Sequence, residues 1–353
     1  MDEEVMRDIA AVTRNTAEVV TREELEELMQ QKPRGERKAY IGFEPSGTVH
    51  IGWMVCANKI LDLTGAGFEV TVLLADWHAY LNNKFDGDID SIRLCARYMI
   101  DAFEALGVPR DSVKFRYAYE LMDSIDYWEK VMRIGRASSL ARIRRALTIM
   151  GRQEEEVEGD AAKFIYPLMQ AADIFELEVD VAYGGMDQRK AHMLARDVAS
   201  KLGRRKPIAL HTPLLAGLDA GGRMDPAEAK MSKSRPDSGI FIHDAPEDVR
   251  RKMKKAYCPE NEVEGNPVMD MARYVVMPRM GALHIKRPEK WGGDMHFETP
   301  EKLVQTYASG GLHPADLKAG VAEALVGMLE PVRAYFEANP GNYEAVRNLG
   351  VTR

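Results

Sequence analysis

Apolar and polar positions alternate along the first two thirds of the chain in the way that is typical of strands and helices that follow one another. Residues 38–43 (KAYIGF) and 68–74 (FEVTVLL) are short runs rich in β-branched and aromatic residues, which favour buried strands. Between them, apolar residues recur with helical spacing over 53–63, and Gly65 and Gly67 end that segment. The pattern predicts a strand–helix–strand unit with parallel strands, because a helical crossover connects parallel neighbours.

The alternation continues beyond this unit. It predicts helices over 89–106, 164–177 and 188–202, and strands over 113–117 and 179–183. Strands that alternate with helices are typical of an open, doubly wound parallel sheet. We therefore expect an α/β fold of the Rossmann-like kind.

Two segments fall outside this alternation. Residues 124–159 are charged and helical in pattern, and they are too long for an ordinary connection, so they predict a helical insertion. From about residue 240 the pattern becomes mainly helical, with an amphipathic helix over 319–336. We expect an α/β domain over 1–239 that carries the insertion, and a mainly α-helical domain over 240–353.

The composition is that of an ordinary globular protein, with 353 residues, 45% hydrophobic and 29% charged. No apolar run approaches the roughly 18 residues that a membrane-spanning helix needs, and the acidic start, MDEE, is unlike a secretory signal. We therefore expect a cytoplasmic protein. Cys56, Cys95 and Cys258 are far apart and form no CxxC pair, so neither a disulfide framework nor a metal site is predicted.

The charge balance of 48 Lys and Arg against 55 Asp and Glu gives a net charge of −7. This argues against a surface that is basic on all sides, as in a protein that wraps nucleic acid. A local basic patch remains open, because six arginines gather in the insertion, at positions 133, 136, 142, 144, 145 and 152.

Two further segments point to a bound phosphate. Residues 44–53 (EPSGTVHIGW) connect the first strand to a helix, and a helix start offers backbone N–H groups to an anion. Residues 230–234 (KMSKS) place two ammonium groups and two hydroxyls in one loop, which suits a phosphate clamp. Singly, the first is also compatible with a plain strand-to-helix turn and the second with a solvated linker. Together they favour a nucleotide site.

HIGW at 50–53 and KMSKS at 230–234 resemble the HIGH and KMSKS signatures of class I aminoacyl-tRNA synthetases. Within that class, the chain from about residue 8 to 336 resembles the archaeal and eukaryotic tyrosyl-tRNA synthetases. One position departs from the signature, because Trp53 replaces the second histidine and an indole cannot carry a positive charge. The segments that carry the closer resemblance are 40–47 (YIGFEPSG), 73–81 (LLADWHAYL), 184–190 (GGMDQRK), 255–259 (KAYCP) and 264–267 (EGNP).

The resemblance implies that L-tyrosine reacts with ATP, accompanied by Mg²⁺, and is then transferred to tRNA(Tyr) for translation. It assigns catalysis to His50, Lys230 and Lys233, which would stabilise negative charge on the phosphates. The tyrosine carboxylate is already ionised, so its attack on the α-phosphorus requires no general base. The implied ATP-binding residues are Glu44, Gly47, His50, Gly52, Gly185, Asp187, Lys230, Met231, Ser232, Lys233 and Ser234.

The substrate phenol is one donor and one acceptor, so a selective site needs a carboxylate and a second hydroxyl or amide. The resemblance places Tyr40 and Asp173 at this hydroxyl, and Tyr166, Gln170 and Gln188 at the α-amino group. The spacing i, i+4, i+7 predicts that Tyr166, Gln170 and Asp173 share one helical face; a purely structural polar network is the alternative. No editing domain is expected, since rejection of phenylalanine by tyrosyl-tRNA synthetases is itself the standard illustration of selectivity through a stranded polar partner.

For the RNA, the resemblance places Arg144 and Arg145 near the first base pair of the acceptor stem, where a guanidinium can read a base edge. It places Asp316, in the HPADLK segment at 313–318, at the first anticodon base. The alternatives are a solvated helix face for the arginines and a helix cap for Asp316. The resemblance also implies that the insertion forms a homodimer interface.

Three other functions share some of these features. A tryptophanyl-tRNA synthetase has the same fold and signatures, but Tyr40 and Asp173 favour tyrosine. A catalytically silent RNA-binding paralogue is suggested by Trp53 and opposed by His50 and by the lysines of KMSKS. A smaller nucleotidyltransferase would leave the domain over 240–353 without a role.

Overall fold

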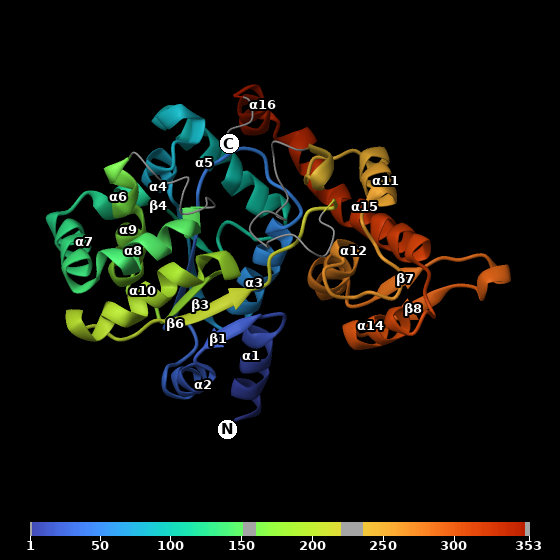
Figure 1. The fold of residues 1–353 in the computed structure, drawn as a ribbon, viewed down its shortest axis with the longest axis horizontal. Helices are drawn as coiled ribbons and strands as arrows, with labels where there is room; N and C mark the ends of the chain where they lie inside the picture. The colour runs from blue at the N-terminus through green and yellow to red at the C-terminus, as the bar shows by residue number, and fades with distance from the viewer. Residues whose placement is uncertain (1, 151–159, 220–235, 350–353) are drawn as a thin grey trace. The chain divides into compact units, whose positions relative to one another are not determined.

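A computed structural model describes residues 2–150, 160–219 and 236–349 (Figure 1). Its backbone forms two compact units, the first comprising mainly residues 1–46 and 59–213 and the second mainly residues 47–58 and 214–347. The expected boundary after residue 239 falls inside the second unit. Residues 47–58 belong there because the Ile51 N–H donates to the Ile240 carbonyl (2.7 Å) and the Ile242 N–H donates to the Val49 carbonyl (3.1 Å).

The first unit is built on a six-stranded sheet in the order β1-β6-β5-β2-β3-β4. All neighbours run parallel except β1, which pairs antiparallel with β6 at one edge. The expected Rossmann-like parallel sheet is therefore confirmed, with an antiparallel edge strand that the sequence pattern did not predict. The strands are β1 (Glu18–Val20), β2 (Arg37–Phe43), β3 (Phe68–Leu74), β4 (Lys114–Tyr117), β5 (Val181–Gly185) and β6 (Ile208–Thr212).

The central strands β2 and β3 pair along their whole lengths, from Arg37 opposite Phe68 to Phe43 opposite Leu74. β3 is an almost continuous apolar run, which is what a strand covered on both faces requires. Its residues Val70, Val72 and Leu74 are fully buried. The hydrophobic burial of this strand therefore fixes the middle of the sheet.

Ten helices of the described chain accompany the sheet, and α7, α8, α9 and α10 pack on one another beside it (Figure 1). α7 begins after Ser124, whose side chain accepts from the Tyr127 N–H, and Pro167 occupies the first turn of α9. The helices are α1 (Glu3–Thr13), α2 (Arg22–Gln31), α3 (Trp53–Gly65), α4 (Asp76–Leu81), α5 (Ile89–Ala105), α6 (Ala118–Met122), α7 (Ile125–Ala137), α8 (Leu140–Ala146), α9 (Tyr166–Glu176) and α10 (Arg189–Ala199).

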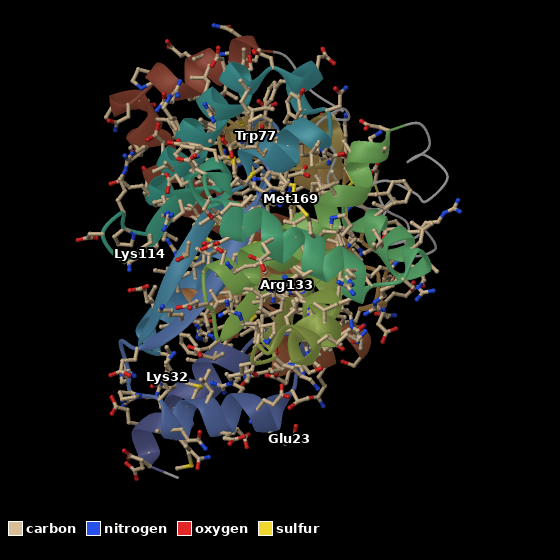
Figure 2. All side chains as sticks on the ribbon, turned by 90° about the vertical axis from the view of Figure 1, so that its left-hand side faces the viewer. Glu23, Lys32, Trp77, Lys114, Arg133 and Met169 are labelled. Carbon is tan, nitrogen blue, oxygen red and sulfur yellow. The ribbon has the colours of Figure 1, made fainter. Side chains whose placement is uncertain are left out.

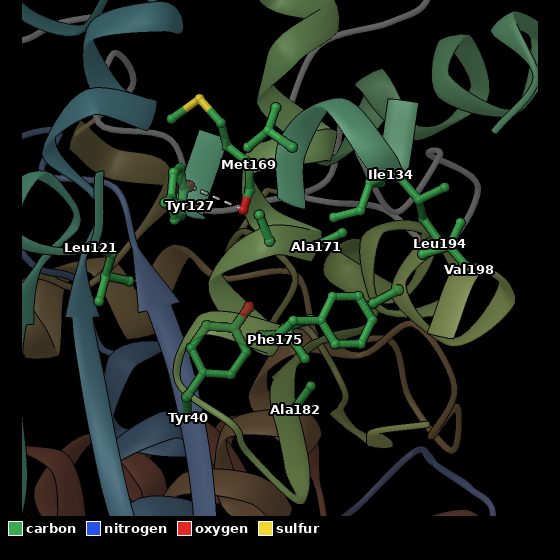
Figure 3. Close-up of a cluster of buried hydrophobic side chains, with 14 of the residues drawn as sticks. Tyr40, Leu121, Tyr127, Ile134, Met169, Ala171, Phe175, Ala182, Leu194 and Val198 are labelled. Atoms are coloured by element: carbon green, nitrogen blue, oxygen red, sulfur yellow. Dashed lines mark hydrogen bonds between the residues drawn. The ribbon is translucent and has the colours of Figure 1, made fainter. Parts of the chain in front are cut away.

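A buried core lies where α7, α9 and α10 meet the sheet (Figure 3). Met169, Ala171 and Phe175 of α9 line it from the helix side, and Tyr40 points from β2 toward α9. The Tyr127 hydroxyl reaches the same core from α7 and lies 3.4 Å from the Met169 carbonyl. Hydrophobic packing thus brings two tyrosine hydroxyls beside α9.

The second unit is mainly α-helical, as expected, and α15 packs against α11 and against a short hairpin that the sequence pattern did not predict. No helix within the described ranges is long and apolar enough to cross a membrane. The elements are α11 (Pro246–Lys255), α12 (Pro267–Met271), α13 (Met277–Met280), β7 (Leu283–Ile285), β8 (Met295–Phe297), α14 (Pro300–Ala308), α15 (Pro314–Ala338) and α16 (Gly341–Asn348).

Candidate functional site

The polar residues that the spacing placed on one helical face do lie together on α9. Tyr166 and Asp173 are buried, and Gln170 is partly buried between them. Tyr40 adds a fourth polar side chain from β2, and it is 1% exposed. Together with their partners described next, these residues form what we call the polar cluster: Tyr40, Glu44, His78, Asn82, Tyr127, Tyr166, Gln170, Asp173 and Gln188.

Both oxygens of the Asp173 carboxylate have a polar neighbour. The Tyr127 hydroxyl donates to Oδ1 at 2.8 Å, and His78 Nε2 lies 3.1 Å from Oδ2. Burial lowers the pKa of His78, but the Asp173, Glu44 and Asp76 carboxylates outweigh it and keep that pKa above its usual value. A charged imidazole beside Asp173 is thereby favoured. Each carboxylate oxygen accepts more than one hydrogen bond, so Asp173 can still accept from a ligand hydroxyl.

The Tyr40 hydroxyl is buried and makes no hydrogen bond of normal geometry to the described residues. Burial raises its pKa strongly and the Asp173 charge raises it further, while the Gln170 amide acts in the opposite direction. The Gln170 Oε1 is likewise buried without a partner within the described chain. Both ring nitrogens of His78 are also buried without a hydrogen bond of normal geometry to the described residues. Buried polar atoms normally pair, so four such atoms in one cluster indicate a site for a polar ligand.

Glu44 joins the polar cluster from the chain just beyond β2. The Tyr166 hydroxyl donates to Glu44 Oε1 at 2.6 Å, and the Asn82 amide donates to both carboxylate oxygens at 3.0 and 2.9 Å. Burial and the Glu44 charge raise the pKa of Tyr166 far above its usual value. Tyr166 therefore stays a neutral donor to Glu44 and keeps lone pairs for a ligand cation.

The end of β5 supplies the last polar side chains. Gln170 Nε2 donates to Gln188 Oε1 at 3.1 Å, which ties α9 to the turn before α10. Gly185 ends β5, and Asp187 lies in the short 3₁₀ turn that follows, two residues further on. A carboxylate at the carboxyl end of a parallel strand is well placed to accept from sugar hydroxyls.

The HIGW segment lies in the second unit. The Gly52 N–H donates to His50 Nδ1 at 3.1 Å, which fixes the imidazole against its own turn. A Cβ at Gly52 would come within 2.7 Å of His50 Cε1, so any other residue there would displace the imidazole from its present position. Gly47 has a φ of +111°, a backbone conformation that glycine allows. The predicted backbone contact of this histidine is therefore present, at Nδ1.

The KMSKS segment, with Lys230, Met231, Ser232, Lys233 and Ser234, lies outside the described residues, as does Arg152 of the insertion. The expected ATP contacts of this loop therefore stay predictions.

The insertion presents the arginines that the sequence singled out. Arg144 and Arg145 are exposed on α8 and form no ion pair within the described ranges, whereas Arg142 pairs with Asp197 and Arg133 (Figure 2) with Glu129. A hollow of about 380 Å³ beside α8 is lined by Ala137, Ser138, Ser139, Arg142, Arg145, Leu194, Asp197, Val198 and Lys201. Its side chains favour an anion.

Asp316 lies in the first turn of α15, and the cap of that helix is His313, whose side chain accepts from the Ala315 N–H. The alternative that Asp316 is a helix cap is therefore wrong. Its carboxylate lies 3.9 Å from Arg287, on the β7–β8 hairpin. The same hairpin carries Trp291, which is 64% exposed, an unusual position for a large aromatic side chain.

Sequence reasoning did not assign a role to Tyr127, His78, Asn82 or Trp291. His78 lies in the LADWHAYL segment that carried the resemblance, and this was the one available signal. Tyr127 comes from the insertion, and nothing in its local pattern shows that it reaches Asp173, 46 residues away. Long-range contacts of this kind follow only from the packing of α7 on α9.

Comparisons with known proteins identify the family of the chain. Residues 31–330 match the family described as tRNA synthetases class I (W and Y). The Tyrosine--tRNA ligase of Aeropyrum pernix is 50% identical over 348 residues, which cover 96% of this chain and 95% of that protein.

Solved structures match over the whole chain as well. The tyrosyl-tRNA synthetase of Aeropyrum pernix has a TM-score of 0.88 and 46% identity, with 98% of this chain and 99% of that one covered. That of Pyrococcus horikoshii, solved with L-tyrosine, has a TM-score of 0.91 and 40% identity, with 99% and 100% covered. The resemblance read from the sequence is thereby confirmed, and the chain belongs to the tyrosine–tRNA ligases of the class I tRNA synthetases.

Proposed function

We propose that this chain activates L-tyrosine with ATP and transfers it to the 3′-terminal adenosine of tRNA(Tyr), with the polar cluster as its tyrosine site. Relatives that are 45–50% identical over nearly the whole chain carry this activity in their names. The observation that supports the site most strongly is that Tyr40 Oη and Gln170 Oε1, both buried, have no partner in the described protein. A bound tyrosine supplies both missing partners.

The phenol and the ammonium group of the substrate bind at opposite ends of the polar cluster in this proposal. The phenol donates to Asp173, which Tyr127 and His78 hold in place, and exchanges a hydrogen bond with Tyr40. The ammonium donates to Gln170 and Tyr166, with the Glu44 carboxylate behind them as the compensating charge. This arrangement selects a long, planar amino acid with a hydroxyl at its far end.

In the first step, a tyrosine carboxylate oxygen bonds to the α-phosphorus of ATP as the bond to the pyrophosphate oxygen breaks. Catalysis is then positioning and charge stabilisation by His50, Lys230 and Lys233, with Mg²⁺ bound to the phosphates as ATP brings it. Asp187 and Gly185 hold the ribose. In the second step, a ribose hydroxyl of the tRNA attacks the tyrosyl carbonyl carbon and AMP leaves.

The tRNA meets the chain at two places in this proposal. Exposed Arg144 and Arg145 bind the acceptor end, since unpaired guanidinium groups on a surface suit phosphates and base edges. Asp316 accepts from a base of the anticodon, beside His313, and exposed Trp291 offers a stacking surface to bases. Charging for translation takes place in the cytoplasm, where we place the protein.

The insertion forms a homodimer interface in this proposal. Ile125 and Met132 lie seven residues apart on α7 and are 77% and 67% exposed, and Leu140 at the start of α8 is 70% exposed. Large apolar side chains in one region of a surface indicate a protein contact. Met132→Glu should convert the dimer to a monomer in light scattering after size-exclusion chromatography, and an unchanged mass would contradict the interface.

Tyrosine-dependent exchange between ATP and labelled pyrophosphate tests the activity, with every amino acid tried in turn. Exchange with tyrosine is expected, and none with phenylalanine. Asp173→Asn should abolish exchange at tyrosine concentrations that saturate the wild type, because the amide cannot replace the carboxylate toward Tyr127, His78 and the phenol. Exchange that depends on tryptophan and not on tyrosine would overturn the proposal, and tRNA binding without any exchange would favour the silent paralogue.

A further inference from the structure

At the edge of the sheet formed by β1, β6 and β5 lies a group of side chains to which the mechanism above assigns no role. We call Glu18, His211 and His192 the row. Glu18 of β1 lies opposite His211 of β6, and His211 lies opposite Gly184 of β5. Residues that face each other across neighbouring strands point to the same side of a sheet, so Glu18 and His211 share one face. The antiparallel edge strand is therefore aligned with the end of β5.

The first turns of α10 close over this row. The His192 ring stacks on that of His211 at 5.1 Å between centroids and 18° between planes, with His192 Nδ1 3.0 Å from His211 Nε2. A Cβ at Gly184 would lie 3.1 Å from His192 Cε1 and 3.0 Å from Gln188 Cβ. The glycine leaves the space that lets both residues of α10 and its preceding turn pack against β5.

Glu18 contacts the start of α10 directly at Arg189 and reaches His192 of α10 indirectly through His211 of β6. It accepts from Arg189 Nε at 2.7 Å and from Nη2 at 2.9 Å, and its Oε2 lies 3.1 Å from His211 Nδ1. Arg189 adjoins Gln188, and His192 follows Gln188 by four residues, one helical turn. The Glu18 carboxylate thus holds the chain directly after Gln188, which links this turn to the polar cluster.

The hydrogen bonds also fix the tautomers. Hydrogen bonds from Arg189 keep the pKa of Glu18 below its usual value, so this carboxylate only accepts. His211 Nδ1 must then be the donor, which leaves its Nε2 as the acceptor of the His192 Nδ1–H. Burial lowers the pKa of His192 to about 3 and that of His211 below its usual range, so both rings are neutral at pH 7. The other charged groups near the pair are Arg189 and Asp187.

We propose that Glu18 is a positioning residue for amino-acid binding: through Arg189 on one side and His211 and His192 on the other, it holds the first turn of α10 so that Gln188 stays in the polar cluster. The His192 ring also lies 6.4 Å from that of Tyr40, so the chain of contacts reaches both ends of the cluster. This inference rests on the proposed tyrosine site, and it assigns a function to the edge strand.

The test compares Glu18 with Glu24, a second glutamate of the N-terminal segment that pairs with an arginine of α10. Glu24 accepts from Arg196 at 2.7 and 3.1 Å, near the other end of α10, and contacts no histidine of the row. In pyrophosphate exchange, Glu18→Ala should raise the KM for tyrosine about tenfold and the KM for ATP by less. Glu24→Ala should leave both values unchanged, although it loses the same kind of ion pair. Glu18→Gln, which keeps an acceptor for His211, should restore most of the tyrosine affinity.

Two outcomes would overturn the proposal: a tyrosine KM in Glu18→Ala within about twofold of the wild type, or an equal rise in Glu24→Ala. Gln188→Ala separates this failure from failure of the tyrosine site itself. If Gln188→Ala raises the KM and Glu18→Ala does not, the edge strand has no positioning role; if neither does, the assignment of Gln188 is wrong. ¹⁵N-histidine spectra give a readout that is independent of activity. An Nε2–H tautomer at His211 in the wild type would contradict the proposed hydrogen bonds from His211 to Glu18 and from His192 to His211.

Discussion

Tyr40→Phe should separate the stability of the free protein from its affinity for tyrosine. The hydroxyl is buried and makes no hydrogen bond of normal geometry in the described chain, and an unsatisfied buried polar group costs about 1–3 kcal/mol. Removing it should therefore leave the free energy of unfolding unchanged or raise it by about 1 kcal/mol. The same change removes one hydrogen bond to the substrate phenol.

That bond is between neutral groups, so its loss should cost about 1–1.4 kcal/mol, a rise in the KM for tyrosine of about five- to tenfold. Tyr127→Phe is the matched control, because the Tyr127 hydroxyl donates to Asp173 at 2.8 Å. Loss of a hydrogen bond to a carboxylate should lower the free energy of unfolding by about 2 kcal/mol. The two variants remove the same atom from the same core but act in different ways on the free protein.

Urea denaturation without ligand and pyrophosphate exchange with tyrosine measure the two quantities. The reasoning fails if Tyr40→Phe destabilises the free protein as much as Tyr127→Phe does, since Tyr40 would then have a structural partner. It fails equally if the tyrosine KM is unchanged. Phenylalanine-dependent exchange should rise relative to tyrosine-dependent exchange in Tyr40→Phe, because one of the groups that reject phenylalanine is gone.

Three further variants test other parts of the chain. Lys233→Ala should slow adenylate formation about a hundredfold with little loss of tyrosine affinity, and an unchanged single-turnover rate would exclude a catalytic role. Asp316→Ala should weaken aminoacylation and leave pyrophosphate exchange intact, so equal loss in both assays would contradict an anticodon contact. His243 stacks on Tyr343 at 3.6 Å between centroids, and burial lowers its pKa to about 3. The unfolded chain takes up this proton near pH 6.5 while the folded one does not, so stability falls as the pH drops from 6.5 toward 3. His243→Phe should cut the loss between pH 7 and 5 by about 2 kcal/mol in urea titrations, and an unchanged loss would contradict this cause.

The elements that local patterns determine were predictable. The apolar run of β3 was placed at its observed bounds, 68–74, because a strand covered on both faces needs no partner information to be recognised. The helical face of Tyr166, Gln170 and Asp173 followed from their spacing. β1, with three residues, and β6, which contains alanine and histidine, carry too little local signal for such an assignment.

The parts of the site that sequence did not supply depend on sheet order. Glu18 and His211 are 193 residues apart, and only the order β1-β6-β5 makes them neighbours. The ATP contact of Glu44 stays a prediction, and the sequence did not show that its carboxylate accepts from Tyr166 and Asn82 within the polar cluster. A signature segment identifies candidate functional residues. Which residues they contact depends on strands and helices that are distant in the sequence.

In the proposed tyrosine site, selectivity for tyrosine follows from where the polar cluster lies. Six of its nine residues, Tyr40, His78, Tyr127, Tyr166, Gln170 and Asp173, come from β2, α4, α7 and α9. Glu44, Asn82 and Gln188 lie in the turns next to β2, α4 and α10. Phenylalanine would fit the same volume but would leave Asp173 and Tyr40 without the partner that a phenol provides, at a cost that the packed core cannot relieve by moving. In this proposal, discrimination against phenylalanine takes place during binding. The same reasoning gives the proposed role of Glu18 at the sheet edge: the turn that carries Gln188 must be held as firmly as the residues that would touch the ligand.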